Sequence, residues 1–185
     1  MVFANWLEIL FTATEVALLI YKRSEKEGTR SNRDRRSLLL LWLVIGGSMT
    51  YTSFTEHHHT WPLPGDAGLI TGIIIFGLGF IIRWTAIVQL GKMFTVNVAI
   101  HKDHSLNTKG LYKIVRHPSY LGLLMILAGI GFSMNSILNM LIIIIPCFLA
   151  LSFRISVEEA ALTDNFGEQY RNYKRRVARL IPWVY

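Results

Sequence analysis

Cysteine is almost absent from the 185-residue sequence, which contains only Cys147. A single cysteine excludes an internal disulfide and a cysteine-based zinc site. Because Cys147 lies within a long apolar run, we expect a buried and unreactive thiol. No basic region precedes the first apolar stretch and no clear small-residue cleavage site follows it, so we predict no cleavable signal peptide.

Signatures of nucleotide, nucleic-acid and metal binding are also missing. No glycine-rich dinucleotide fingerprint follows a predicted strand, so a cofactor would need another kind of pocket. The formal charge is +7, but its basic residues form short clusters rather than a tract interleaved with aromatic residues, which predicts no nucleic-acid partner. Three adjacent histidines, 57–59, cannot all converge on one ion unless the backbone is irregular, and we expect them in a loop without metal.

Charged residues are scarce, at 17% of the chain, whereas hydrophobic residues make up 52%. Five apolar segments stand out, at about residues 2–21, 38–54, 67–90, 120–132 and 137–153. The sequence therefore predicts a single all-α integral membrane domain, residues 1–185, with about five transmembrane helices. At 1.5 Å per residue the fourth segment reaches only about 20 Å, short of the hydrocarbon core of about 30 Å. We therefore expect it to form a helical hairpin with the fifth.

The basic residues are distributed unevenly between the connections. They concentrate at 22–36, in the segment 91–119 and in the tail 154–185, whereas 56–66 and 133–136 contain no lysine or arginine. By the positive-inside rule, the N-terminus is outside and the C-terminus is cytoplasmic, with 91–119 and 154–185 as cytoplasmic catalytic segments.

Polar and small residues within the spans need an explanation. Arg83 either extends to the membrane surface or faces a pocket. Asn5, Glu8, Thr12 and Glu15 share one face of the first span, which predicts that this face looks into the bundle or a dimer contact. The four glycines of the third span indicate close helix packing: Gly68, Gly72, Gly77 and Gly79.

Two polar clusters flank the predicted hairpin. Pro118 stands where the fourth span begins, in the first-turn position that proline tolerates, and it places Arg116 and His117 at the membrane surface. Arg154 and Glu158 lie four residues apart at the cytoplasmic end of the fifth span. Alone, these clusters fit interfacial anchors and a simple ion pair. In a hairpin, they would meet at one mouth.

A stripe of apolar and aromatic residues follows at helical spacing. It consists of Leu162, Phe166, Tyr170, Tyr173 and Val177. On an otherwise charged helix, such a stripe suits a helix lying on the membrane surface.

These motifs together resemble the isoprenylcysteine carboxyl methyltransferase family and its prokaryotic relatives. The resemblance runs from Gly91 to the C-terminus and rests on Gly110-x-Tyr112-x-x-x-Arg116-His117-Pro118-Ser119-Tyr120-x-Gly122, Arg154-x-x-x-Glu158-Glu159 and Phe166-Gly167-x-x-Tyr170-x-x-Tyr173.

The resemblance implies an enzyme that uses S-adenosylmethionine to methylate a carboxylate. It implies a lipid-like or prenylated small-molecule acceptor, such as an isoprenylated cysteine, that arrives through the membrane lipid. Arg154 and Glu158 would be catalytic, with Arg154 also binding the substrate carboxylate. The implied cofactor-binding residues are His104, Ser105, Leu106, Asn107, Tyr112, His117, Pro118, Ser119, Tyr120 and Glu158. One departure is Asn107, where the family often has valine.

Three alternatives stay open at this point. A phospholipid or other amine methyltransferase would need a base to deprotonate its acceptor. A sterol-type membrane reductase carries a similar Arg-His-Pro-x-Tyr segment and uses a nicotinamide cofactor, but this chain is shorter than such enzymes usually are. A small transporter or assembly protein would explain Glu8, Glu15 and Arg83, but it would leave the two polar clusters as coincidence.

Overall fold

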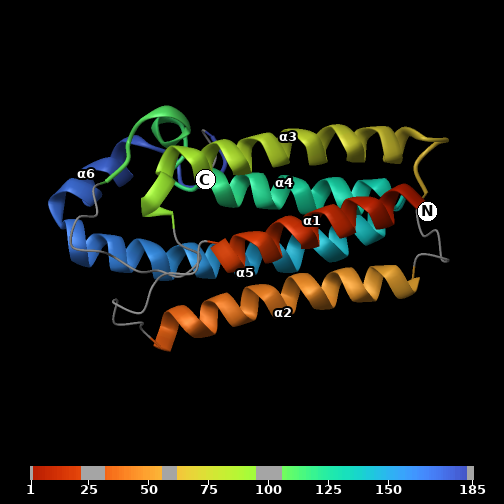
Figure 1. Ribbon diagram of the computed structural model, residues 1–185, viewed down its shortest axis with the longest axis horizontal. Helices are drawn as coiled ribbons and strands as arrows, with labels where there is room; N and C mark the ends of the chain where they lie inside the picture. The colour runs from red at the N-terminus through yellow and green to blue at the C-terminus, as the bar shows by residue number, and fades with distance from the viewer. Residues whose placement is uncertain (1, 22–31, 56–61, 95–105, 183–185) are drawn as a thin grey trace.

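The computed structural model describes residues 2–21, 32–55, 62–94 and 106–182, and all regular structure in these ranges is helical. The elements are α1 (Val2–Tyr21), α2 (Asn32–Thr55), α3 (Ala67–Leu90), the short 3-10 turns η1 (Gly91–Met93) and η2 (Gly110–Lys113), α4 (Pro118–Ser133), α5 (Ile137–Phe166) and α6 (Glu168–Arg176). Helices α1 to α5 lie lengthwise side by side, and α6 sits at the end of the bundle away from the start of α1 (Figure 1). His57–His59, His104 and Ser105 lie outside the described residues.

Helix α4 is at the centre of the bundle. It packs against α3, α5 and α1, while α2 packs on α5. Only Met134, Asn135 and Ser136 separate α4 from α5, so the two form the predicted antiparallel hairpin. The Ser136 hydroxyl accepts a hydrogen bond from the Asn139 amide at 3.3 Å and caps α5. The core of this hairpin includes the fully buried Cys147, as expected.

Glycines set the close approach of α3 and α4. A Cβ atom on Gly72 would lie 2.6 Å from the carbonyl oxygen of Gly129, and one on Gly79 would lie 2.8 Å from that of Gly122. Gly68 is equally tight against the end of α4. The packing predicted for these three glycines is confirmed. The prediction is wrong for Gly77, because a Cβ atom there would meet only open space.

The outer faces of the bundle are apolar. Large side chains such as Leu43, Phe54, Ile81 and Val88 are mostly exposed, which is typical of surfaces that meet lipid. Among the described residues, three helices are long and apolar enough to cross a membrane, namely Asp34–Phe54, Ala67–Leu90 and Ile137–Phe166, and α4 is a shorter apolar helix. The chain is thus a membrane protein whose described part is helical and contains three candidate spans. Spanning by α1 and α4 stays a prediction.

Two helices extend past the apolar spans predicted for them. Helix α2 begins at Asn32, before the span that starts near residue 38, and α5 continues to Phe166, beyond the span that ends near residue 153. The 30 residues of α5 reach about 45 Å, which exceeds a hydrocarbon core of about 30 Å. One end of α5 must therefore project beyond the hydrocarbon.

The C-terminal stripe is not one surface helix, so that prediction was wrong. Gly167, at φ +53°, separates α5 from α6. A left-handed conformation of this kind favours glycine. Tyr170 and Tyr173 are buried inside the protein, and the Tyr173 hydroxyl donates to the carbonyl of Tyr112 at 2.5 Å. Tyr173 therefore holds α6 against η2.

The acidic face of α1 is only partly internal. Glu15 is buried and Glu8 is half-buried, but Thr12 is exposed. Glu15 forms a two-pronged ion pair with Arg83 on α3, with Nε–Oε1 at 2.6 Å and Nη2–Oε2 at 2.7 Å. Arg83 is itself buried, so it faces the interior instead of extending to the membrane surface.

Candidate active site

The start of α4 and the Arg154–Glu159 segment of α5 meet in the structure. Pro118 occupies the first turn of α4, where a missing N–H costs nothing, and His117 is the N-cap residue. The Tyr120 hydroxyl donates to Oε2 of Glu158 at 2.8 Å, and His117 Nδ1 lies 3.9 Å from Oε1 of the same carboxylate. The His117 and Tyr120 rings stack with their centroids 5.7 Å apart. The two segments thus form one polar cluster.

Glu159 has the most ionic contacts in that cluster. Its carboxylate lies 2.8 Å from Arg116 Nε, 3.4 Å from His117 Nε2, 3.3 Å from Lys174 Nζ and 3.4 Å from Arg179 Nε. These nitrogen-bearing side chains come from the approach to α4, from α6 and from the tail. Glu159 therefore ties three parts of the chain together.

The tail also pairs with the approach to α4 through the backbone. The Arg116 amide donates to the Ala178 carbonyl at 2.8 Å, and the His117 amide donates to the Arg179 carbonyl at 3.2 Å. Arg116 adds side-chain hydrogen bonds to the carbonyls of Lys174 and Val177. His117 is therefore fixed from both its backbone and its ring.

The two adjacent glutamates differ in exposure. The Glu159 side chain is 6% exposed and surrounded by cations, whereas that of Glu158 is 28% exposed. Glu158 is therefore the carboxylate of this pair that a ligand from solution can reach.

Arg154 lies one turn before Glu158 and is buried against α2. Its Nη1 donates to the Asp34 carboxylate, to the Asp34 carbonyl at 3.0 Å and to the Ser37 hydroxyl at 2.8 Å. Asp34 could not be predicted as a partner of Arg154 from the sequence, because it lies 120 positions earlier in the chain and no motif links the two.

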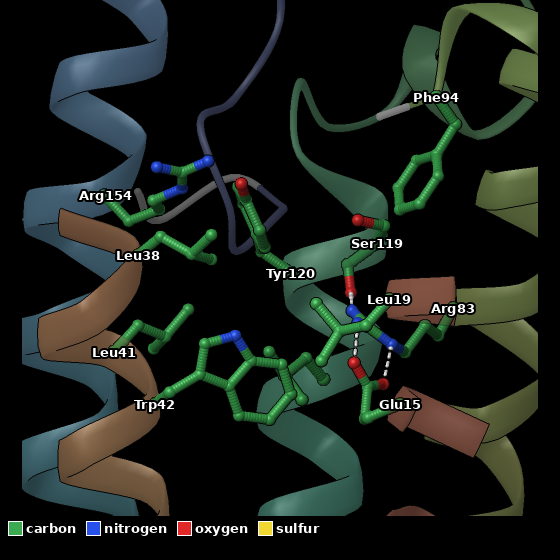
Figure 2. Close-up of a pocket in the computed structure, with 11 residues that line it drawn as sticks. Glu15, Leu19, Leu38, Leu41, Trp42, Arg83, Phe94, Ser119, Tyr120 and Arg154 are labelled. Atoms are coloured by element: carbon green, nitrogen blue, oxygen red, sulfur yellow. Dashed lines mark hydrogen bonds and ion pairs between the residues drawn. The ribbon is translucent and has the colours of Figure 1, made fainter. Parts of the chain in front are cut away.

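A cavity adjoins Arg154 and Tyr120 on the inner side of the polar cluster. The space inside it that a water-sized molecule can occupy is about 40 Å³, and the whole hollow with the open space at its mouth is about 480 Å³. Its lining comes from α1, α2, α3, α4, α5 and the residue after η1: Glu15, Leu19, Leu38, Leu41, Trp42, Arg83, Phe94, Ser119, Tyr120, Leu123 and Arg154 (Figure 2). Arg83 also donates to the Ser119 carbonyl at 3.0 Å, so the Glu15–Arg83 ion pair forms one wall of the cavity.

The remaining predicted site residues lie around η2. The Tyr112 hydroxyl donates to the Ala86 carbonyl at 3.3 Å, and burial, reinforced by the Glu158 carboxylate, raises the pKa of Tyr112. Burial raises the pKa of Tyr173 to about 12, although Arg116 opposes the shift. Both phenols therefore stay protonated at neutral pH and can act as hydrogen-bond donors.

Asn107 and Leu106 lie at the edge of the cluster. The Asn107 amide donates to the Gln89 carbonyl at 3.0 Å, and its oxygen accepts from the Lys109 amide at 3.0 Å. These contacts fasten the segment to the end of α3. Leu106 is half-buried.

The sequence profile of the isoprenylcysteine carboxyl methyltransferase (ICMT) family matches residues 70–164, which include α4 and both polar clusters. The chain belongs to this family. Among its ICMT relatives, protein-S-isoprenylcysteine O-methyltransferase of Schizosaccharomyces pombe is 37% identical over 109 residues, covering 58% of this chain and 46% of the relative. Methanethiol S-methyltransferase of Pseudomonas deceptionensis is 30% identical over 131 residues, covering 66% of this chain and 49% of that protein.

The fold is also similar to a solved member of the ICMT family. The structure of a eukaryotic intramembrane Ras methyltransferase ICMT superposes with a TM-score of 0.66 at 24% identity, covering 96% of this chain and 64% of that one. The chain spans about half the length of the curated relatives named above.

Proposed function

We propose that this chain is an S-adenosylmethionine-dependent carboxyl O-methyltransferase of the membrane, acting on a lipid-like acceptor such as an isoprenylated cysteine. The observation that carries the proposal is that Tyr120 takes part in both the polar cluster and the cavity. Its hydroxyl donates to the partly exposed Glu158, and its side chain lines the largely apolar cavity beside Arg154. A polar site and an apolar site therefore share one residue.

The polar cluster suits the cofactor. S-adenosylmethionine supplies an electrophilic methyl group on a cationic sulfonium. The partly exposed Glu158 carboxylate offers a counter-charge to a cation, and the rings of Tyr120 and His117 offer aromatic surface. The Tyr112 hydroxyl donates its proton to the Ala86 carbonyl, and its oxygen can still accept a hydrogen bond from the cofactor. We assign cofactor binding to these four residues, together with Pro118 and Ser119 at the start of α4 and the segment 104–107.

The cavity suits the acceptor. A carboxylate is already ionised at neutral pH, so its methylation requires no general base. Arg154 borders the cavity and can bind and orient a carboxylate there, because a guanidinium offers several donors in a fixed plane. The apolar lining excludes water, and this favours a reaction that neutralises the acceptor's charge.

The proposal includes an orientation. We place the N-terminus outside and the cluster at the end of α5 at the cytoplasmic surface, on the charge asymmetry of the connections. A lipid-like acceptor then enters from the bilayer and the cofactor enters from the cytoplasm. Labelling of single cysteines at Ser31 and Ser53 in a Cys147→Ser background checks this, because only Ser53 should react from outside.

A second candidate is S-methylation of a small thiol, which the 30% identity to a methanethiol S-methyltransferase favours. A thiol must lose a proton before attack, since the thiolate is the nucleophile. Methyl transfer to N-acetyl-S-farnesylcysteine and to methanethiol, measured with the same protein in detergent, separates the two. Methylation of the farnesylated acid supports the proposal, whereas exclusive methylation of the thiol replaces it.

A further inference from the structure

The polar groups around the cavity are almost all engaged within the protein. Glu15 and Arg83 neutralise each other, Arg154 is held by Asp34 and Ser37, and the Tyr120 hydroxyl donates to Glu158. The charges on the cavity wall are therefore largely balanced within the protein, and much of the remaining wall is hydrocarbon. Its occupant is a molecule with a substantial apolar part.

Among the buried side-chain polar atoms of the described residues that line the cavity, the indole N–H of Trp42 is the one without a hydrogen-bond partner. Its Nε1 atom is buried, and no hydrogen-bond acceptor lies within reach of it in the described part of the chain. Trp42 lines the cavity, and Figure 2 shows the nitrogen-bearing edge of its ring turned toward Leu38 and Tyr120. Buried donors are nearly always satisfied in folded proteins, so this one calls for a partner.

An apolar wall does not explain the N–H group. Leu38, Leu41 and Leu123 already line the cavity with hydrocarbon, and phenylalanine at position 42 would do the same without burying a donor. An oxygen of a bound molecule would satisfy it. A thiol or thioether sulfur would do so poorly, because sulfur is a weak acceptor.

We propose that Trp42 is an acceptor-recognition residue, whose indole N–H donates a hydrogen bond to an oxygen of an amphipathic methyl acceptor bound in this cavity. The inference depends on the proposed function only where it calls the bound molecule a methyl acceptor. The binding site itself is argued from the cavity alone. It specifies the substrate class further. The acceptor carries an oxygen next to its apolar part, which sets it apart from methanethiol.

The test compares two ligands and two variants. Affinities of N-acetyl-S-farnesylcysteine and of the oxygen-free farnesyl methyl sulfide are measured by calorimetry in detergent, without cofactor. The variants are Trp42→Phe and the control Trp84→Phe, whose ring lies on α3 beside Phe80, outside the cavity lining. Loss of one hydrogen bond should weaken the acid by about 2- to 12-fold in Trp42→Phe. The sulfide should bind Trp42→Phe as it binds wild type, and Trp84→Phe should change neither.

Replacement of Trp42 by 3-benzothienylalanine provides a second variant if Trp42→Phe misfolds, because it keeps the shape of the ring and removes only the N–H. An unchanged affinity for the acid in either folded variant overturns the inference, as does an equal loss for acid and sulfide. So does a wild-type protein that binds neither ligand. Cofactor binding and methyl transfer to the acid are measured in separate assays. A protein that shows the Trp42 effect without methyl transfer refutes the proposed function and leaves the acceptor site standing.

Discussion

The Glu15–Arg83 ion pair allows a quantitative prediction. Its two charge-assisted hydrogen bonds measure 2.6 and 2.7 Å, and the side chains are only 5% and 8% exposed. Arg83→Met leaves the Glu15 carboxylate buried without a counter-charge and removes the bond to the Ser119 carbonyl. We expect the free energy of unfolding to fall by about 3–5 kcal/mol.

The double variant Glu15→Gln with Arg83→Met removes both charges and should recover most of that loss, because neither partner is then an isolated ion. Thr12→Ala on the exposed face of α1 is the control and should have little effect. Unfolding in detergent, followed by circular dichroism, measures all of them. The reasoning is refuted if Arg83→Met is as stable as wild type, or if the double variant is no more stable than Arg83→Met.

Two further predictions concern packing and catalysis. Gly72→Ala should destabilise the protein by about 1–3 kcal/mol, because its Cβ would overlap the α4 backbone, whereas Gly77→Ala has open space and should be neutral or slightly stabilising in the same unfolding assay. Arg154→Lys keeps the charge but loses the planar fork, so methyl transfer should fall by about tenfold or more while S-adenosylmethionine affinity changes little. Loss of cofactor affinity in Arg154→Lys would instead make Arg154 a cofactor or structural residue.

Where apolar runs have clear ends, the sequence predicts the helices well. The segment 67–90 coincides with α3, because loops rich in polar residues and glycine flank it on both sides. The start of α2 and the end of α5 lie outside the apolar spans and could not be predicted from them, because helix formation continues into charged residues once tertiary contacts support them. At the start of α2, Asp34 is buried against Arg154, and near the end of α5, Glu159 is buried among cations.

The residues of the candidate site can be predicted from the sequence only where they belong to a recognisable motif. The segment around His117 and the pair Arg154 and Glu158 could be named from the sequence. The hydrogen bond between Tyr120 and Glu158 depends on the hairpin. Whether the indole N–H of Trp42 finds an acceptor depends on the orientation of the ring. No spacing in a sequence encodes ring orientation, so such contacts need coordinates.

Direct binding of the cofactor tests the central claim most closely. Calorimetry in detergent compares S-adenosylmethionine with NADPH, for wild type, Glu158→Gln and the exposed control Glu168→Gln. The account predicts that S-adenosylmethionine binds and NADPH does not, that Glu158→Gln weakens binding by about 10- to 100-fold, and that Glu168→Gln has no effect. Binding of NADPH without S-adenosylmethionine, or equal S-adenosylmethionine affinity in Glu158→Gln and wild type, would contradict it.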